Sequence, residues 1–295
     1  MKIVTYHYIR NKDKLFPYRK FITKKKFNQN LKFFNKSGLV NNYDELLDES
    51  DKYLLTFDDG LKDHIYAAEL LKKNNAIGIF FIQSYPLLNQ DILDVHKIHL
   101  VTSKVKGEII LNELQNYLKK NKIKNFENRL EKKFYKDSYK KYLDENSVKI
   151  FKSTMNYYSD TRLKHKILNY LLKKFDINIK PKNYYLNKKE IKYLSSLGMI
   201  IGSHTQDHHV LSRLSYKKQF SQIKNNKVFL EKIINKKIDT FCYPYGSKLS
   251  YNRNTIHILK KLKFKNAFTT LHGDVNYKNI LKTPLELPRY DCNIF

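Results

Sequence analysis

Short apolar segments alternate with helical patterns along the first third of the chain. Apolar residues fill 53–57 and 76–82, and Ala67, Leu70 and Leu71 between them share one helical face. A strand, a helix and a second strand in this order favour a parallel sheet with crossover helices.

The same alternation resumes in the last third of the chain. The predicted strands there are short and apolar, and the predicted helices carry apolar residues at helical spacing. The remaining predicted elements are a first strand within 1–9, a helix capped by Thr23, a short helix at 43–47, helix 61–74, helix 187–197, strand 198–202, helix 215–234, strand 238–242, helix 250–263, strand 266–270 and a last strand near 286–290. Together they predict an α/β fold with about seven parallel strands.

Residues 86–186 interrupt this alternation. They are rich in lysine, tyrosine, leucine and asparagine, and helical spacing appears at 109–118 and at 163–171. We expect a helical insertion here, or a small lid placed over the strand ends. His96 and His99 are expected to be structural histidines. Four aromatic residues are expected to pack inside the insertion rather than to bind sugar: Phe134, Tyr135, Tyr139 and Tyr142.

Two adjacent carboxylates, Asp58 and Asp59, end the apolar segment 53–57 and precede Gly60. They are expected at the carboxyl end of a buried strand, where α/β folds place their chemistry. Two like charges side by side repel each other unless a cation or a shared proton relieves them. The alternative is an Asp-Gly turn in which an aspartate caps the next helix.

His204 and His208 follow a second apolar segment and lie four residues apart. One helical turn would place both imidazoles on the same face. Two imidazoles and one carboxylate form a three-ligand site with room for water, which is typical of catalytic zinc. A histidine pair alone is weak evidence, but a strand that ends in two aspartates strengthens it.

Three motifs resemble those of the polysaccharide deacetylases, the family-four carbohydrate esterases with NodB homology. TFDDG at 56–60 resembles their first motif, HTQDH at 204–208 resembles their second, and FCYPYG at 241–246 resembles their third. The resemblance covers roughly residues 1–85 and 187–291.

This resemblance implies a fold and an activity. The fold is a distorted (β/α) barrel of about seven parallel strands over residues 1–295, with the helical insertion at about 86–186 inside it. The activity is that of a metal-dependent hydrolase that removes an N-acetyl group from an amino sugar, in a glycan or linked to a lipid or a nucleotide. We expect a role in surface polysaccharide biosynthesis. The alternative is a catalytically weak carbohydrate-binding protein that keeps the deacetylase fold.

The candidate site residues divide into metal ligands and a base. If the two strand ends meet, Asp59, His204 and His208 are expected to hold a divalent metal ion, with zinc as the first candidate. Asp58 is then expected to take the proton from the attacking water. The resemblance implies the same division, and it implies that the backbone N–H of Tyr245 stabilises the tetrahedral oxyanion.

The leaving amine needs a general acid. Many members of the family use a histidine in a late Leu-x-His motif, which this chain lacks in its usual strand context. The nearest match is LHG at 271–273, with His272 at its centre. We prefer His7, at the end of the first predicted strand, because the branch of the family with circularly permuted motifs has a histidine there.

Two departures from the family pattern affect the expected site. Cys242 stands where the third motif usually has an arginine that positions the base. Arg289 on the last predicted strand, or a lysine, is the candidate replacement. The aspartate-to-tryptophan motif of the family cannot exist, because the chain contains no tryptophan.

The chain is strongly basic, with 57 Lys+Arg, 28 Asp+Glu and a net charge of +29 over its 295 residues. Such a field attracts phosphates, nucleic acid or an anionic membrane face. A compositional bias towards lysine and asparagine explains the charge equally well. We therefore expect an acetylated amino-sugar substrate. A phosphate group on that substrate and peripheral contact with a membrane are options. Nucleic acid is not expected as a partner, because no nucleic-acid-binding motif appears.

Other features of the sequence bear on location. No apolar run has the length of a membrane span, and the amino end is too short and too polar for a signal peptide. Two cysteines, Cys242 and Cys292, give no disulfide framework. A cytoplasmic location is therefore expected.

Overall fold

The computed structural model describes residues 1–42, 51–124, 126, 144–157 and 160–295. The chain forms two compact units. The barrel unit consists of Met1–Asn11, Phe21–Asp91 and Pro181–Phe295, and the helical unit consists of Lys12–Lys20 and Ile92–Lys180.

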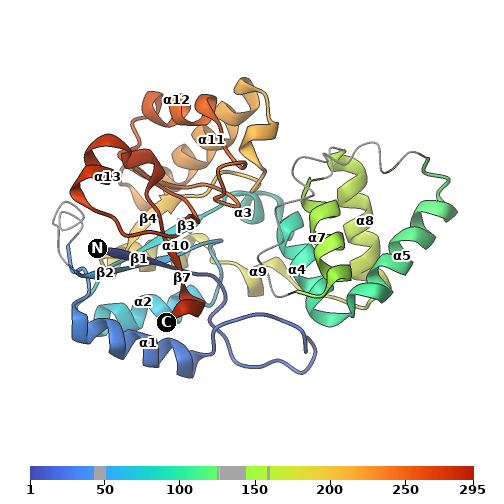
Figure 1. The fold of residues 1–295 in the computed structure, drawn as a ribbon, viewed down its shortest axis with the longest axis horizontal. Coiled ribbons are helices and arrows are strands. Elements are labelled where there is room, and N and C mark those ends of the chain that lie inside the picture. Colours follow the sequence, from blue (N-terminus) through green and yellow to red (C-terminus); the bar gives the residue numbers. More distant parts are fainter. Residues whose placement is uncertain (43–50, 125, 127–143, 158–159) are drawn as a thin grey trace. The chain divides into compact units, whose positions relative to one another are not determined.

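Seven parallel strands form the sheet of the barrel unit (Figure 1). Their spatial order is β6-β5-β4-β3-β2-β1-β7, so the first six strands are neighbours in chain order and the last lies beside the first. The strands are β1 Lys2–Tyr6, β2 Tyr53–Phe57, β3 Gly78–Ile82, β4 Ile200–Ser203, β5 Thr240–Cys242, β6 Asn266–Phe268 and β7 Tyr290–Asp291. They confirm the predicted α/β fold with about seven parallel strands.

The chain from Leu287 to Asp291 closes the sheet into a barrel. Leu287 bridges Phe268 of β6 and donates its N–H to the carbonyl of Ala267 at 2.8 Å. Three residues later, Tyr290 and Asp291 pair with β1 at the opposite edge of the sheet. One short piece of chain therefore joins both edges, and the result is the distorted (β/α) barrel that the resemblance implied.

Helices cover the outside of the barrel, with α1 and α2 on one side of the strands and α11 and α12 on the other (Figure 1). The predicted caps are confirmed, because the hydroxyls of Thr23 and Ser215 accept the N–H groups of Lys26 and Lys218 at 3.0 and 3.4 Å. The helices of this unit are α1 Lys24–Ser37, α2 His64–Lys73, α3 Tyr85–Asn89, α9 Pro181–Tyr184, α10 Lys188–Ser196, α11 Tyr216–Ile234, α12 Arg253–Lys261 and α13 Tyr277–Lys282, with 3₁₀ turns η3 Leu211–Arg213, η4 Pro284–Glu286 and η5 Cys292–Ile294.

Both faces of the strands are buried, in two separate apolar clusters. Leu54 of β2 belongs to a cluster inside the barrel that contains inward-facing strand residues. The covering helices α1, α2, α10, α11 and α12 contribute no residue to this cluster. The next residue, Leu55, belongs to the larger cluster that includes the apolar faces of those helices. Successive strand residues thus alternate between the barrel interior and the helix layer. The same alternation directs Thr56 and Asp58 to the interior side.

The helical unit contains four main helices in its described part. They are α4 Asp94–Lys104, α5 Gly107–Lys120, α7 Asn146–Tyr157 and α8 Thr161–Lys174. The helices α5 and α8 confirm the helical spacing expected at 109–118 and 163–171. The unit also includes Lys12–Lys20, so it is not built from the predicted insertion alone. Its placement over the strand ends stays a prediction, and the short helix at 43–47 and the aromatic residues Phe134, Tyr135, Tyr139 and Tyr142 lie outside the described residues.

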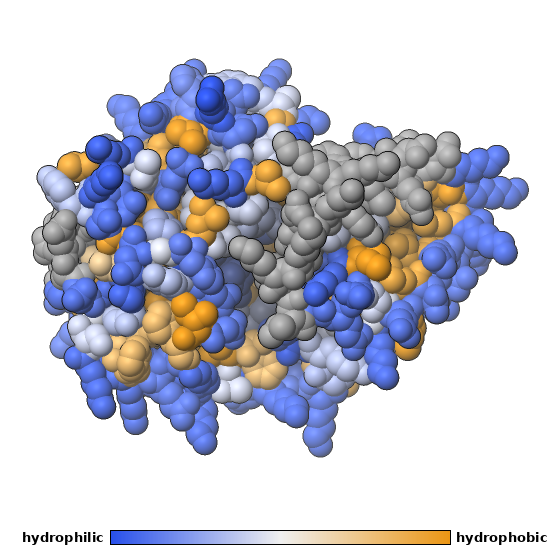
Figure 2. All heavy atoms as spheres, in the orientation of Figure 1, coloured by the Kyte–Doolittle hydropathy of each residue, from blue (hydrophilic) through white to orange (hydrophobic). Residues whose placement is uncertain are grey.

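Hydrophilic side chains predominate on the face of the molecule shown in Figure 2, with hydrophobic ones scattered among them. Exposed lysines line the outer face of α1, for example Lys25, Lys32 and Lys36. Within the described ranges, no helix combines the length and the apolar character that crossing a membrane requires. Part of the lysine excess is therefore carried by the exposed face of α1.

A buried histidine fixes the start of α2 to the end of β1. His64 is 0% exposed and lies beside the rings of Phe57 and Phe80, at 5.6 and 5.9 Å between centroids. Its Nε2–H donates to the backbone carbonyl of His7 at 3.0 Å. Burial lowers the pKa of His64 to about 4, so the imidazole is neutral at pH 7.

We expect the free energy of unfolding to fall as the pH drops from about 6.5 to about 4. The unfolded chain, in which His64 has its ordinary pKa, takes up the proton first and is thereby stabilised. This linkage should lower the free energy of unfolding by about 2 kcal/mol between pH 7 and pH 4.5. Urea unfolding with EDTA present measures the change. His64→Phe keeps a ring beside Phe57 and Phe80 and should lose this part of the pH dependence. An unchanged pH dependence in His64→Phe would contradict the assignment.

Candidate active site

Four neighbouring strands end at one end of the barrel, and each carries a polar residue there. Asp58 and Asp59 follow β2, Gln83 follows β3, His204 follows β4 and Cys242 is the last residue of β5. Because these strands are parallel neighbours, residues that are far apart in the sequence lie side by side at this edge. The structure therefore brings the two predicted strand ends together.

Asp59, His204 and His208 converge on one point. The Nε2 atoms of both histidines lie 3.5 Å from Oδ1 of Asp59. One ligand atom from each of the three residues lies within 4.8 Å of the others, and all three side chains are buried. Two imidazole nitrogens and one carboxylate oxygen are the donor set of a catalytic zinc site that keeps an open position. The residues present therefore fit a divalent metal ion.

The two histidines do not share a helical face, so that sequence-based expectation was wrong. The chain from His204 to His208 forms a loop in which Thr205 and His208 both have left-handed backbone conformations. The hydroxyl of Thr205 accepts the N–H of His208 at 3.1 Å. Gln222 of α11 accepts the N–H of Asp207 at 2.9 Å and donates to its carboxylate at 2.7 Å. A braced turn, rather than the helical period, sets the distance between the imidazoles.

Four residues around this point have positive φ angles: Asp59 at 79°, Thr205 at 64°, His208 at 58° and Tyr245 at 63°. Side chains other than glycine rarely adopt this region, and each instance costs on the order of 1–3 kcal/mol. Such strain persists only where the surrounding contacts hold the chain in place, and it clusters at functional sites. The backbone strain therefore marks the same point as the side chains.

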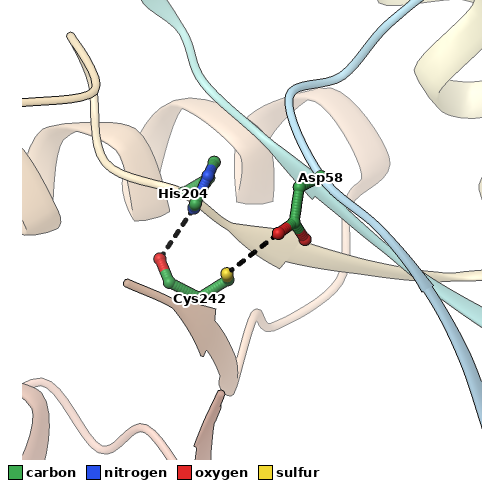
Figure 3. Close-up of side chains that lie close together, drawn as sticks. All are labelled: Asp58, His204 and Cys242. Carbon is green, nitrogen blue, oxygen red and sulfur yellow. Dashed lines mark hydrogen bonds between the residues drawn. The ribbon is translucent and has the colours of Figure 1, made fainter. Parts of the chain in front are cut away.

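The backbone carbonyl at the end of β5 fixes a proton on Nδ1 of His204. The carbonyl oxygen of Cys242 accepts a hydrogen bond from Nδ1 of His204 at 2.8 Å, as Figure 3 shows. A carbonyl can only accept, so Nδ1 carries a proton, and Nε2 is the nitrogen on the side of Asp59. This is the tautomer that binds a metal through Nε2.

Asp58 is paired with a buried arginine from the other end of the chain. Arg289 donates to both carboxylate oxygens of Asp58 at 2.8 Å. It also donates to the hydroxyl of Thr56 at 3.0 Å and to the carbonyl of Thr269 at 2.8 Å. Arg289 is 0% exposed and Asp58 is 2% exposed. A bidentate pair of this kind fixes the orientation of the carboxylate as well as its charge.

Burial alone would raise the pKa of Asp58, but the Arg289 guanidinium lowers that pKa well below its usual value. Asp58 is therefore ionised at neutral pH. Burial raises the pKa of the Cys242 thiol, which stays neutral and donates to Asp58 at 3.5 Å (Figure 3). Arg289 thus takes the place of the arginine that the third motif lacks, as the sequence suggested.

A second trio, Asp58, His204 and Cys242, also has ligand atoms within 4.8 Å of one another. An ion there would have to break the hydrogen bond from Nδ1 of His204. It would also lie beside the Arg289 guanidinium, whose Nη2 is 3.1 Å from Sγ of Cys242. Two cations so close together repel strongly in a buried site. This trio therefore suits the arginine, and Asp59, His204 and His208 are the better candidate ligands for an ion.

The other predicted catalytic residues lie at different distances from this centre. Nε2 of His7 lies 3.9 Å from Oδ2 of Asp58, and the His7 side chain is 42% exposed. The ring of Tyr245 packs against His208 at 5.0 Å between centroids. His272 packs against a tyrosine ring of β7 at 5.8 Å, and no contact recorded for the described residues links it to the other site residues.

Several contacts of the site were missed from the sequence. Gln83 donates to Oδ1 of Asp59 at 2.8 Å, and Thr5 donates to Oδ2 of Asp58 at 3.4 Å. Gln83 occupies the same position after β3 that Asp58 occupies after β2, so its place at a strand end was the available signal. A lone glutamine suggests no chemistry, and the contact became evident only from the structure.

The chain belongs to the polysaccharide deacetylase family. Residues 111–267, more than half of the chain, match the family model described as polysaccharide deacetylase. The matched segment includes the second and third motifs. Family membership makes the protein a carbohydrate deacetylase, which is a hydrolase.

Solved structures with the same fold include the following three proteins. They are the Streptococcus pyogenes deacetylase PplD in complex with acetate (18% identity, TM-score 0.59, 99% of this chain and 91% of that chain), IcaB from Ammonifex degensii (14%, 0.56, 98% and 90%) and a de-N-acetylase from Aggregatibacter actinomycetemcomitans (14%, 0.57, 99% and 95%). At identities this low, the likeness shows the fold alone. A comparison with curated proteins found no match.

Arg289→Met should lower the free energy of unfolding by about 3–5 kcal/mol, because it leaves the Asp58 carboxylate buried without its cation. Urea unfolding at pH 7 measures the loss. Adding Asp58→Asn to the same chain should recover part of it. Lys2→Met breaks an exposed ion pair with Asp274 and is the control, with an expected cost of less than about 1 kcal/mol. If Arg289→Met costs no more than Lys2→Met, Arg289 is not the counter-charge of Asp58.

Proposed function

We propose that this protein is a metal-dependent N-deacetylase that removes an acetyl group from an amino sugar. The observation that carries the proposal is the convergence of Asp59, His204 and His208 on one point, with the ionised Asp58 beside them. Membership of the deacetylase family supports the hydrolysis of an acetyl group. The donor set supports a divalent ion, with zinc as the first candidate.

Three residues would hold the ion, Asp59 through a carboxylate oxygen and His204 and His208 through Nε2. When bound, such an ion polarises the acetyl carbonyl and makes a water molecule more acidic. His204 is already held in the required tautomer by the carbonyl of Cys242. The His204 ring is therefore oriented before the ion arrives, which reduces the cost of binding it.

Asp58 is placed to take the proton from the attacking water. It is ionised, and Arg289 fixes the direction of both of its oxygens. A carboxylate with a lowered pKa is a weak base, so proton transfer to Asp58 depends on the increased acidity of the water. The lowered pKa has a compensating benefit, because Asp58 stays ready to accept a proton in mildly acidic solution.

His7 is placed to give a proton to the leaving amine. Its Nε2 is 3.9 Å from the base, and its partly exposed ring is accessible to a substrate. The backbone N–H of Tyr245 is the proposed donor to the oxyanion. The positive φ of Tyr245 and its ring contact with His208 hold that turn next to the metal-binding point.

The proposed substrate is an acetylated amino sugar that carries phosphate, as a nucleotide-linked or a lipid-linked sugar does. The net charge of +29 supports a phosphate-bearing substrate. Under this proposal the protein acts in the cytoplasm, in surface polysaccharide biosynthesis, and peripheral contact with an anionic membrane face would bring it to a lipid-linked substrate.

Acetate release and bound zinc, measured together, test the proposed function. Asp58→Asn should lower kcat/KM by at least about 100-fold and keep the zinc, because it removes the base and leaves the ligands intact. Asp59→Ala should lose zinc and activity together. Asp274→Asn, an exposed aspartate far along the chain, is the matched control and should match the wild type.

The outcomes separate the alternatives. A fully active Asp58→Asn variant, or a wild type that holds no metal, would overturn the proposal. Sugar binding without acetate release would identify a carbohydrate-binding protein instead. The assay uses acetylated nucleotide sugars and acetylated glucosamine oligomers side by side, and release from the oligomers alone would refute the phosphate-bearing substrate.

The choice of general acid is tested by two matched variants. His7→Gln should lower kcat by about 100-fold without loss of zinc, because the leaving amine then departs unprotonated. His272→Gln should leave kcat unchanged, since its ring packs against β7. The reverse pattern would transfer the role to His272.

A further inference from the structure

Gln83 is a buried polar residue at the metal-binding point that the proposed mechanism does not use. It directly follows Ile82, which pairs with Ser203 in the parallel register of β3 and β4. Gln83 therefore stands beside His204 at the same end of the barrel. It is only 2% exposed. A side chain in this position is surrounded by protein and acts on its immediate neighbours.

The amide of Gln83 donates a hydrogen bond to the Asp59 oxygen that faces His204 and His208. Its Nε2 donates to Oδ1 of Asp59 at 2.8 Å. The same oxygen lies 3.5 Å from Nε2 of His204 and 3.5 Å from Nε2 of His208. A carboxylate oxygen accepts in two directions. One direction is used by Gln83, and the other faces the two imidazoles.

The other end of the amide is costly to bury. Oε1 of Gln83 is a buried atom without a hydrogen-bond partner among the described residues. Burying such an oxygen costs about 1–3 kcal/mol, and an apolar side chain of similar volume would avoid that cost. The preceding strand, GIFFI, is apolar and fully buried. The N–H group that reaches Asp59 is therefore the feature that explains a glutamine at this position.

We propose that Gln83 is a positioning residue that holds Asp59 in the orientation in which it binds the divalent ion. Asp59 needs such support, because its backbone is strained at a φ of 79° and the charge of Asp58 next to it is repulsive. A neutral amide attracts the carboxylate without adding a positive charge that would compete with the ion. This inference rests on the proposed metal-dependent function.

Zinc affinity is the direct test, measured on metal-free protein by competition with a chromophoric chelator. Gln83→Leu should weaken zinc binding about 10- to 100-fold, because Asp59 loses the contact that orients it. Gln83→Met matches the length of the side chain and provides the same comparison if the leucine variant does not fold. Ser84→Ala is the matched control, because its buried hydroxyl has no recorded hydrogen bond and Ser84 is the next residue. Its zinc affinity should equal that of the wild type.

Thermal melts distinguish positioning from a general structural role. Without metal, Gln83→Leu should melt close to the wild-type temperature, because the lost hydrogen bond to Asp59 and the removal of the unpaired Oε1 act in opposite directions. At the same zinc concentration, the metal-induced rise in melting temperature should be smaller for Gln83→Leu than for the wild type. Equal zinc affinity in the wild type and both Gln83 variants would overturn the inference and leave the proposed function standing. A wild type that binds no zinc would overturn both.

Discussion

Two carboxylates that are adjacent in the chain must be neutralised by different partners. Asp58 and Asp59 end one buried strand, where two negative charges in a medium of low dielectric constant repel each other. Arg289 neutralises Asp58 through two hydrogen bonds of 2.8 Å. Asp59 instead faces His204 and His208, a donor set that suits a divalent ion. This separation gives two identical side chains different properties, Asp58 as a fixed anion and Asp59 as a candidate metal ligand.

The backbone of the strand end makes the separation geometrically feasible. Asp58 continues the inward register of β2 after Thr56, and so it meets Arg289 inside the barrel. In a continued strand the next residue would point to the opposite face. Asp59 leaves the strand with a φ of 79°, which turns its carboxylate towards the loop after β4. The strain at Asp59 is therefore the structural reason that both aspartates serve the same end of the barrel.

Local chemistry explains which parts could be predicted from the sequence. Strand 53–57 and the Ser215 cap depend on nearby residues, and both were predicted correctly. The convergence of Asp59, His204 and His208 was predictable because aspartate and histidine at strand ends are chemically distinctive. The loop conformation that brings His208 to the site was not predictable, because it depends on a turn braced by α11 rather than on a periodic pattern. Gln83 was missed for a similar reason, since its importance lies in what it contacts and not in its residue type.

Cys242 and Arg289 together retain a contact that the third motif alone does not supply. In the family that the sequence resembles, the arginine comes from the motif strand itself, whereas here a small thiol leaves space that the Arg289 guanidinium fills at 3.1 Å from the sulfur. Arg289 lies between Leu287, which bridges β6, and Tyr290, which pairs with β1. The cation that orients Asp58 is therefore carried by the piece of chain that closes the barrel. Closure of the sheet and orientation of Asp58 consequently depend on the same segment, and any change that loosens the last strand acts on Asp58 as well.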